Sequence, residues 1–326
     1  MAGTGSRMTP FQRLLDLGNL LVDVVLTVPA LPERGADVLA AQSDTSAGGG
    51  FNVMAAAARQ GLRVAYAGAH GSGPFGELAR AACAQEGIAL VQPPKTGMDT
   101  GFVITIVDAD GERTFLTSRG AEATLTADDL APVQPDPGDA IYLSGYSFVH
   151  PANRGALLTW LERVRDGQHV VFDPGPLVAS IPSQVLDTVL CRADWVTCNL
   201  REATLLTDSP DPLAAVAALT QRTGGGVLVR TGPDGCLLGR PGTEPVHVPG
   251  FRVNALDTNG AGDTHTGTFL AALAVGAGEI EAARRANAAA ALSVTRRGPA
   301  TAPTREELAA SRLLDSRRFF RTGRGD

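Results

Sequence analysis

The sequence is poor in cysteine. Its 326 residues contain four, and none of them form a C-x-x-C pair or the spacing of a zinc site: Cys83, Cys191, Cys198 and Cys236. This pattern argues against a disulfide scaffold and against a structural zinc domain. Reduced thiols in a cytosolic protein are the expected state.

Long apolar runs are also missing. No stretch approaches the roughly 18 uninterrupted apolar residues of a membrane span. The opening "MAGTGSRMTP" has no apolar segment of the kind found in secretion signals. We therefore expect a cytoplasmic protein with no membrane partner, in which residues 1–10 form a disordered tail.

The sequence has fewer basic than acidic residues. Lys and Arg number 28 against 34 Asp and Glu, which gives a net charge of −6 and argues against nucleic acid as the main partner. Hydrophobic residues make up 44% and charged residues 19%, a globular composition. The length suits one large domain with a full core, which we predict to span residues 11–326.

Strand-like and helix-like segments alternate along most of the chain, with about ten or more residues in each connection. Such spacing predicts right-handed crossovers and a mostly parallel sheet with helices on both faces, an α/β fold. The predicted strands are 13–28, 62–69, 88–92, 139–145, 169–175, 193–199 and 226–232. The predicted helices are 51–61, 75–87, 262–276 and 279–295.

Two regions depart from this alternation, at about 20–45 and 97–118. Residues 101–118 read as a hairpin, with two β-rich runs around the turn dipeptide Asp110-Gly111. We expect the two regions to form a small sheet that projects from the main body as a lid. Ligands of such folds bind at the carboxyl ends of the parallel strands.

The stretch "GSGPFG", from Gly71 to Gly76, matches G-x-G-x-x-G. A dinucleotide site also needs an acid about twenty residues further on, to bind the ribose hydroxyls. Residues 91–97 read "VQPPKTG" and contain no carboxylate, and Pro74 removes one amide from the turn. The motif is interpreted as a helix-entry turn.

A second glycine stretch, "DTNGAGD" from Asp257 to Asp263, precedes the apolar run 268–278. A turn at Gly260–Gly262 would present unpaired helix amides, which favour an anion. Asp263 would repel that anion unless it removes a proton from an attacking hydroxyl, as phosphoryl transfer requires. From this stretch alone, a simple helix-start carboxylate remains an alternative.

Further motifs strengthen the catalytic interpretation. "DTNGAGD" resembles the second signature of the ribokinase-like carbohydrate kinases, the phosphofructokinase-B family. The glycine run and alanine-rich helix at 47–61 resemble the first signature. "NLRE" at 199–202, "TGPDGC" at 231–236 and the segment 287–303 resemble three further family motifs. All occur in the family's order, across about residues 14–314.

The resemblance implies a ribokinase-like fold and roles for individual residues. Asp263 would be the general base, and Gly260, Ala261 and Gly262 the anion hole for the γ-phosphoryl group of ATP. Asn199 and Glu202 would act around Mg²⁺ and the phosphates, with Glu202 working through metal-bound water. Without the resemblance, Glu202 reads as an exposed helix-start carboxylate.

On the nucleotide side, the resemblance places Thr231, Gly232 and Gly235 along the ribose and phosphates. The "PDG" turn within this segment fits a bare turn equally well. Asn287 falls where the family contacts the adenine region, and asparagine is otherwise a mediocre helix former.

On the substrate side, an ionised carboxylate accepts hydrogen bonds from sugar hydroxyls more strongly than a neutral acceptor does. Asp23 corresponds to that acid, with a solvent-facing strand residue as the alternative interpretation. Arg119 is either a contact to an anionic substrate or a solvated loop arginine. The implied substrate site comprises Asp23, Gly48, Gly49, Gly50, Asn52, Tyr146 and Arg119.

Three departures argue against ribose itself. Gly49 stands where ribokinase has lysine, Leu21 where it has asparagine, and Tyr146 where it has a glutamate. His265 replaces a more usual aromatic residue, and we assign it no role. The phosphoryl-transfer residues are unchanged.

The resemblance also implies a loop for a monovalent cation such as K⁺. Ala302 stands where ribokinase has a serine ligand, so the sequence leaves dependence on K⁺ open. The expected ligand set comprises Asp257 and Asn259 with carbonyl groups near Ser293, Arg296 and Gly298.

The predicted protein is thus an ATP-dependent kinase of a small sugar or sugar acid. The open edge of the lid sheet predicts a homodimer. A nucleoside kinase would need aromatic surfaces to stack a base, and aromatic residues total 5%, with Phe51, Phe102 and Phe115 near the lid. A non-catalytic sugar or nucleotide sensor is the other alternative, and it would have no use for a base at Asp263.

Overall fold

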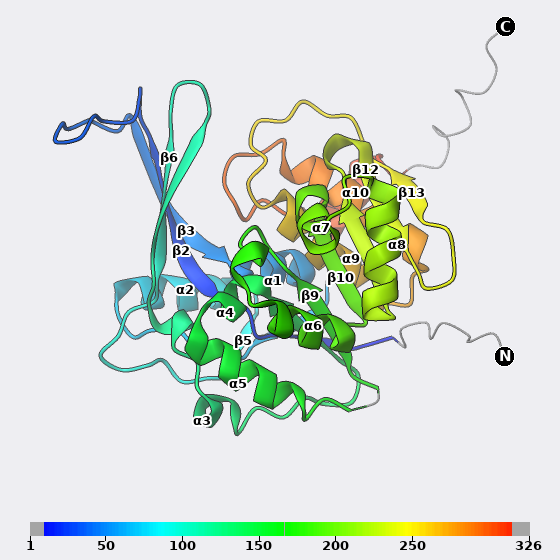
Figure 1. Ribbon diagram of the computed structural model, residues 1–326. Coiled ribbons are helices and arrows are strands. Elements are labelled where there is room, and N and C mark those ends of the chain that lie inside the picture. Colours follow the sequence, from blue (N-terminus) through cyan, green and yellow to red (C-terminus); the bar gives the residue numbers. More distant parts are fainter. Residues whose placement is uncertain (1–9, 166, 315–326) are drawn as a thin grey trace, which may run out of the picture.

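The computed structural model describes residues 10–165 and 167–314, so all but the last residue of the predicted tail lies outside the described ranges. These ranges form an α/β body and a smaller sheet that projects from it (Figure 1). This architecture confirms the predicted fold class. No helix in the described ranges is long and apolar enough to cross a membrane.

The body contains a nine-stranded sheet with the order β13-β12-β11-β10-β9-β8-β1-β4-β5. The strands pair in parallel from β11 to β5, whereas β12 and β13 pair antiparallel and were not predicted. Their bounds are β1 Arg13–Asp16, β4 Arg63–Tyr66, β5 Ala89–Leu90, β8 Asp139–Ser144, β9 His169–Asp173, β10 Trp195–Asn199, β11 Gly226–Arg230, β12 Gly235–Gly239 and β13 Val246–Pro249.

Helices cover both faces of this sheet, because alternate strand side chains are apolar on both sides. In β8, Ile141 and Leu143 join one buried cluster, and Ala140 and Tyr142 join the other. The first cluster includes residues of α5 (Pro151–Leu161), α6 (Ser183–Arg192), α7 (Leu200–Thr207) and α8 (Pro212–Thr223). The second includes residues of α1 (Gly50–Arg59), α2 (Pro74–Gln85), α9 (Ala261–Ala274) and α10 (Glu279–Ser293).

Short helices complete the body. They are α3 (Ala127–Leu130), α4 (Gly145–Val149) and α11 (Arg305–Ala310), with 3-10 turns η1 (Ala121–Ala123), η2 (Val178–Ser180) and η3 (Gly232–Asp234). Of these, α4 and η3 each begin where a parallel strand of the body ends, and both therefore border the site described below.

The lid is a four-stranded sheet with the order β3-β2-β6-β7. Its strands are β2 Leu20–Thr27, β3 Gln42–Gly49, β6 Phe102–Val107 and β7 Arg113–Ser118. The predicted hairpin is confirmed, since β6 and β7 pair antiparallel around Asp110 and Gly111. In Figure 1 the lid stands away from the body, on the side where the strands of the main sheet end.

One predicted strand is wrong. Residues 13–28 form two strands in different sheets, β1 in the body and β2 in the lid. The break falls at Leu17–Asn19, where the Gly18 amide bonds back to the Asp16 carboxylate at 2.5 Å and the Asn19 carbonyl accepts the Gly50 amide at 2.7 Å. The chain therefore moves from one sheet to the other within a continuous apolar run, and the sequence pattern gives no sign of this.

The closest packing between helices α1 and α9 depends on Gly267. A Cβ atom there would lie 2.4 Å from the Val53 carbonyl oxygen and 2.7 Å from the Ala56 Cβ. We expect Gly267→Ala to lower the free energy of unfolding by about 1–3 kcal/mol through overpacking. Gly155→Ala in the exposed part of α5, where nothing lies within 4 Å, is the control and should be neutral or stabilising by up to about 1 kcal/mol. Urea denaturation of both variants checks this, and equal midpoints would contradict it.

Candidate active site

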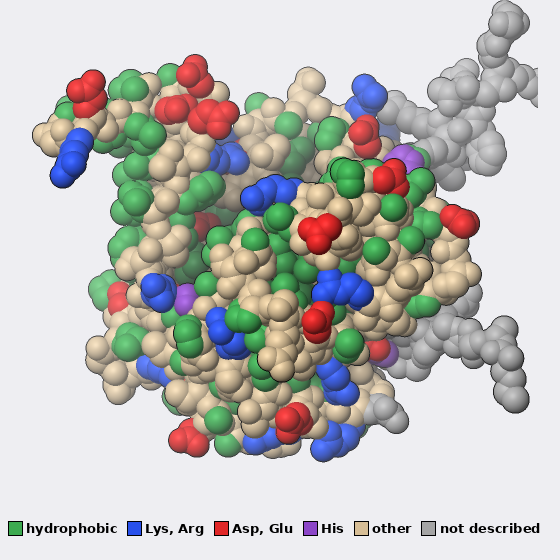
Figure 2. Space-filling model, in the orientation of Figure 1, with side chains coloured by type: hydrophobic (Ala, Val, Ile, Leu, Met, Phe, Trp, Pro, Cys, Tyr) green, Lys and Arg blue, Asp and Glu red, His purple; other side chains and the backbone are tan. Residues whose placement is uncertain are grey.

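Several polar residues, only one of which the sequence analysis singled out, lie at the carboxyl ends of the parallel strands, beneath the lid. Asp16 ends β1, Asp173 ends β9, Asn199 ends β10 and Arg230 ends β11. The space-filling view shows a hollow between the lid and the body (Figure 2). The first turn of α9, with Asp263, is close enough to these ends for its charge to act on several of them.

The amino end of α9 supplies unpaired backbone donors. Gly260 precedes the helix in a left-handed conformation, φ 71°, and a Cβ there would lie 2.0 Å from the Pro299 carbonyl oxygen. The Ala261 amide donates to the Thr258 carbonyl at 3.3 Å. Within the described residues, the amides of Gly260, Gly262 and Asp263 have no hydrogen-bond partner. This helix end can therefore take an anion.

Asp263 lies beside these amides, in the first turn of α9. Its Oδ2 accepts a hydrogen bond from the Asn52 side-chain amide at 3.2 Å. Burial, followed by the negative charge of Asp173, raises the pKa of Asp263 to about 6. A carboxyl group with that pKa is mostly ionised at neutral pH and remains basic enough to take a proton.

Asp23 in β2 faces the same space. Burial, followed by the charge of Asp263, raises the pKa of Asp23 to about 6. Its carboxylate lies on the glycine run, since a Cβ at Gly48 would be 2.2 Å from the Asp23 Oδ2. Gly49, at φ 61°, and Gly50 both pack against the Asn19 carbonyl. The structure thus brings together the predicted acid, the glycine wall, Asn52 and Asp263.

Tyr146 lies in α4, directly after β8, and Arg119 directly follows β7 of the lid. Burial, followed by the charges of Asp263 and Asp173, raises the pKa of Tyr146 to about 12, which places its hydroxyl near the acids. The ring remains 37% exposed. Arg119 is exposed. The pKa of His150 is lowered mainly by burial and, to a smaller extent, by the positive charge of Arg119. Its contact with a substrate stays a prediction.

Arg230, which the sequence analysis missed, occupies the centre of the acidic strand ends. Its Nη1 donates to the Asp173 Oδ2 at 3.3 Å and to the hydroxyls of Thr197 and Thr266 at 2.6 Å and 2.9 Å. Its Nη2 lies 3.7 Å from the Glu202 Oε2. The only signal in the sequence was an arginine at the end of a buried apolar strand.

Arg230 also lies under the anion hole. A Cβ at Gly262 would be 3.3 Å from the Arg230 Nε. The charges of Asp173 and Glu202 outweigh burial and raise the pKa of Arg230 above its ordinary value, so the guanidinium is permanently positive. Positive charge next to unpaired amides strengthens the case for an anion at this position.

Asp16 is a second residue that the sequence analysis missed. Its Oδ1 accepts the Gly18 amide, and its Oδ2 is buried without a partner among the described residues. Burial raises the pKa of Asp16 to about 8, and the charge of Asp263 adds to this. A carboxyl that is mostly protonated at neutral pH needs no cation beside it.

Asn199 and Glu202 form a capping box at the start of α7. The Glu202 amide donates to the Asn199 Oδ1 at 2.9 Å, and the Asn199 amide donates to the Glu202 Oε2 at 2.8 Å. Glu202 is only 3% exposed, unlike the exposed helix-start carboxylate of the alternative interpretation. Burial and the charge of Asp173 raise its pKa, while Arg230 opposes them.

The predicted nucleotide turn lies between β11 and β12. The Thr231 amide donates to the Gly235 carbonyl at 2.8 Å, and the Thr231 hydroxyl is buried without a partner in the described ranges. Gly232 begins the 3-10 turn η3. A Cβ at Gly235 would lie 2.2 Å from the Val248 carbonyl. An orphaned buried hydroxyl at a glycine turn is compatible with a ligand at this position.

Asn287 is fully engaged by the protein. Its amide donates to the carbonyls of Val248 and Pro249 at 3.0 Å and 3.1 Å, and its Oδ1 lies 2.9 Å from the His265 Nε2. Since burial and Arg230 lower the pKa of His265 to about 3, the ring is neutral and Nε2 must be the protonated nitrogen that donates. Asn287 therefore positions the backbone of β13.

The residues of the expected cation loop lie close together. The Asp257 Oδ1 accepts the Asn259 amide at 2.9 Å, and its Oδ2 accepts the Gly298 amide at 3.1 Å. The Ser293 carbonyl accepts the Arg296 amide at 3.0 Å. No cluster of three or more His, Cys, Asp or Glu side chains suited to a metal occurs in the described part of the chain.

In the first glycine motif, the amides at the start of the helix are already bonded by a protein carboxylate. The amides of Phe75 and Gly76, at the start of α2, donate to the two carboxylate oxygens of Asp99 at 3.1 Å and 2.8 Å. This agrees with its interpretation as a helix-entry turn.

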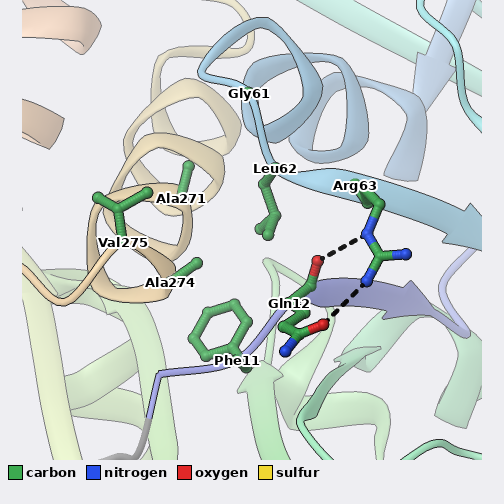
Figure 3. A pocket seen from close by; sticks show the side chains of 8 residues that line it. All are labelled: Phe11, Gln12, Gly61, Leu62, Arg63, Ala271, Ala274 and Val275. Atoms are coloured by element: carbon green, nitrogen blue, oxygen red, sulfur yellow. Dashed lines mark hydrogen bonds between the residues drawn. The ribbon is translucent and has the colours of Figure 1, made fainter.

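A second hollow lies at the other end of the strands, where β1 and β4 begin (Figure 3). It is lined mainly by apolar side chains and by Arg63, which donates to the backbone and side-chain oxygens of Gln12. No acid or nucleophile lines it, so we assign it no chemistry.

Comparison with known proteins gives consistent matches. Residues 12–306 match the pfkB family carbohydrate kinase. An uncharacterized sugar kinase of Escherichia coli (strain K12), YegV, is 31% identical over 306 residues, which cover 92% of this chain and 94% of that protein. The ribokinase of Haemophilus influenzae is 31% identical over 302 residues, covering 89% and 95%. The ATP-dependent ribose-1-phosphate kinase of Halopiger xanaduensis is 30% identical over 306 residues, covering 91% and 97%.

Solved structures share the fold. The ribokinase of Thermotoga maritima superposes with a TM-score of 0.75 at 25% identity, covering 92% of this chain and 98% of that chain. The adenosine kinase of Sinorhizobium meliloti superposes with a TM-score of 0.79 at 23% identity, covering 93% and 98%. The second likeness concerns the fold alone.

The Arg230 cluster predicts a pH-dependent loss of stability. Arg230→Met leaves Asp173 and Glu202 buried without their cation, so their folded-state pKa values rise further above the unfolded ones. The variant is then least destabilised at acidic pH, where both acids hold protons, and most destabilised above neutrality, by about 3–5 kcal/mol.

Urea denaturation at pH 5 and pH 8 measures this difference. The control is Arg285→Met, which removes an exposed pair with Glu281 along α10 and should cost about 0.5 kcal/mol or less at both pH values. A loss for Arg230→Met that is equal at the two pH values would contradict the proposed charge balance.

Proposed function

The chain belongs to the pfkB family of carbohydrate kinases, and from this we propose that it transfers the γ-phosphoryl group of MgATP to a hydroxyl of a small sugar or sugar acid. Asp263 is the general base of this reaction. The observation that carries the proposal is the position of Asp263, beside unpaired helix amides and opposite the acid Asp23.

The transfer step uses few groups. The substrate hydroxyl gives its proton to the Asp263 carboxylate, and its oxygen forms a bond to the γ-phosphorus. The bond from that phosphorus to the bridging oxygen of the β-phosphate breaks, and ADP leaves. The unpaired amides of Gly260, Gly262 and Asp263 and the Arg230 guanidinium would face the oxygens on which negative charge resides, whereas the Ala261 amide is bonded to the Thr258 carbonyl.

Asn52 holds the base in place. Its amide donates to one oxygen of Asp263, which leaves the other oxygen to face the substrate hydroxyl. Its own Oδ1 is buried without a partner among the described residues. A hydroxyl of the sugar would satisfy this acceptor, since buried polar atoms are normally hydrogen-bonded.

The nucleotide would lie along the turn at Thr231, Gly232 and Gly235. Its β- and γ-phosphates would reach the amino end of α9, and Asn287 would support the backbone on the adenine side. Mg²⁺, when bound, neutralises phosphate charge and keeps most of its water ligands. Asn199 and Glu202 would hold it through water.

The sugar would bind between Asp23, the glycine run Gly48–Gly50 and Asn52. Tyr146 would border the sugar, and Arg119 would meet an anionic group if the substrate is a sugar acid. Closure of the lid would exclude water, which otherwise competes with the hydroxyl for the phosphoryl group. The homodimer expected from the lid edges stays a prediction.

A substrate panel tests the proposal. Purified protein with MgATP should release ADP with at least one sugar or sugar acid in a panel that also contains nucleosides. Asp263→Asn should lower kcat by about 100-fold or more, because a general base contributes about that much. Nucleotide binding, measured by calorimetry, should survive.

The matched control is Asp211→Asn. Asp211 also begins a helix, and its side chain accepts the Ala214 amide at 2.7 Å. Asparagine caps a helix about as well as aspartate, so turnover should not change. Near-full turnover by Asp263→Asn would remove the base from the mechanism, and binding without turnover across the panel would favour a sensor. ADP release with nucleosides alone would favour the nucleoside kinase.

The raised pKa of Asp263 predicts an acidic limb in the pH–rate profile. The base must be ionised, so kcat/KM should fall about tenfold per pH unit below a pKa of about 6 and be flat above it. If the ionised form of Asp23 is also needed, the limb becomes steeper, since its pKa is also about 6. Initial rates at subsaturating sugar from pH 5 to 8 measure this, and a flat profile would count against the assignment.

A further inference from the structure

An ion pair spans the gap between the lid and the body. The Arg113 Nη2, at the start of β7, lies 2.5 Å from the Asp257 Oδ1, and the two side chains are 29% and 19% exposed. Among the ion pairs formed by described residues, it is the only one that joins a lid strand to the α/β body. The contact joins the Arg113 side chain of β7 to the loop that precedes α9.

Asp257 also binds two loop segments of the body. Its Oδ1 also accepts the Asn259 amide at 2.9 Å, and its Oδ2 accepts the Gly298 amide at 3.1 Å. Both carboxylate oxygens therefore have donors from the protein. Through Asp257, Arg113 fixes the loop before α9 against the loop at 298–299.

The anion hole rests on the same two segments. Gly260 directly follows Asn259, and the Pro299 carbonyl packs so tightly on Gly260 that a Cβ there would lie 2.0 Å from its oxygen. A shift at Gly298 or Pro299 must therefore move the amides at the start of α9. Contacts therefore run from Arg113 in the lid, through the Asp257 carboxylate, to the amides at the start of α9.

Two of the groups expected to bind a monovalent cation, the Asp257 carboxylate and the Ser293 carbonyl, already have protein donors. An Asp257 oxygen with a guanidinium nitrogen at 2.5 Å has no space for a second positive ion. The Ser293 carbonyl accepts the Thr301 hydroxyl at 3.1 Å and the Arg296 amide at 3.0 Å.

A second arginine binds carbonyl oxygens of the same loop. The Arg59 Nη1 donates to the carbonyls of Ala300 and Ala302 at 2.8 Å each. Two arginines therefore donate to oxygens of this loop: Arg113 to the Asp257 carboxylate, and Arg59 to the carbonyls of Ala300 and Ala302.

We propose that Arg113 is the built-in cation of this loop, a positioning residue that links the lid to the anion hole and makes the kinase independent of K⁺ and Na⁺. The inference rests on the proposed function for its catalytic consequence. The guanidinium supplies the charge that an ion would otherwise bring, and it does so only when the lid is in place. When the lid covers the substrate, it thereby also fixes the position of the amides at the start of α9.

Steady-state rates in KCl, NaCl and choline chloride, at equal ionic strength of about 0.1 M, test this with the substrate found in the panel. The wild-type protein should have the same kcat in all three salts, within about twofold. Arg113→Gln should lose about 10- to 100-fold in kcat in choline chloride, the range typical of a lost positioning contact. K⁺ should restore part of that loss, because the vacated carboxylate can then take an ion.

Two further variants sharpen the comparison. Arg113→Lys keeps the charge and should retain more activity than Arg113→Gln in choline chloride. Arg34→Gln removes an exposed lid arginine that has no ion pair within the described ranges, and it should match the wild type in every salt. Activation of the wild type by K⁺ of tenfold or more would overturn the proposal, as would an Arg113→Gln variant with wild-type kcat in choline chloride.

Thermal unfolding in the same salts gives a readout that needs no turnover. The midpoint of the wild type should not differ between KCl and choline chloride, whereas that of Arg113→Gln should be about 2–4 °C higher in KCl. If no compound in the panel is phosphorylated, the proposed function fails and this measurement still tests the arginine. A K⁺-dependent rise in the wild type, or none in Arg113→Gln, would overturn the inference.

Discussion

The amino end of α9 is half-buried, and three of its peptide N–H groups have no hydrogen-bond partner among the described residues. The rest of the site depends on this constraint. Glycine at position 260 lets Pro299 pack against the turn, and the side chain of Asn52 holds the acid in the first helical turn. The unpaired amides of Gly260, Gly262 and Asp263 favour an anion, and in the proposed reaction Asp263 removes a proton beside that anion.

The strand ends around α9 concentrate negative charge in a poorly solvated space. Burial, together with neighbouring acids, raises the pKa values of Asp16, Asp23 and Asp263 to between about 6 and about 8. Arg230 offsets part of this negative charge, because it pairs with Asp173 and lies next to Gly262. Such an arrangement costs folding stability and leaves the Asp263 carboxylate basic enough to accept a proton near neutral pH, a combination common at active sites.

Much of this followed from local patterns in the sequence. The family, the α/β fold with its separate small sheet and the phosphotransferase class were predicted and are confirmed. Signatures such as "DTNGAGD" are readable because a strand, a turn and a helix start are encoded by neighbouring residues. The roles of Asp263, Asp23 and the nucleotide turn stay predictions, although the structure brings Asp23, Asn52 and Asp263 to one hollow. The continuous strand over 13–28 was wrong, because an apolar run does not record a change of sheet.

The sequence by itself determined which residues begin helices and end strands, and hence the family, since those features depend on neighbours along the chain. Only the tertiary structure decided which side chains meet. Arg230 and Asp173 are 57 positions apart, and Arg113 and Asp257 are 144 apart. Their pairing depends on the order of strands in two sheets and on how the lid stands over the body. No local pattern carries that information, because long-range packing brings these charges together.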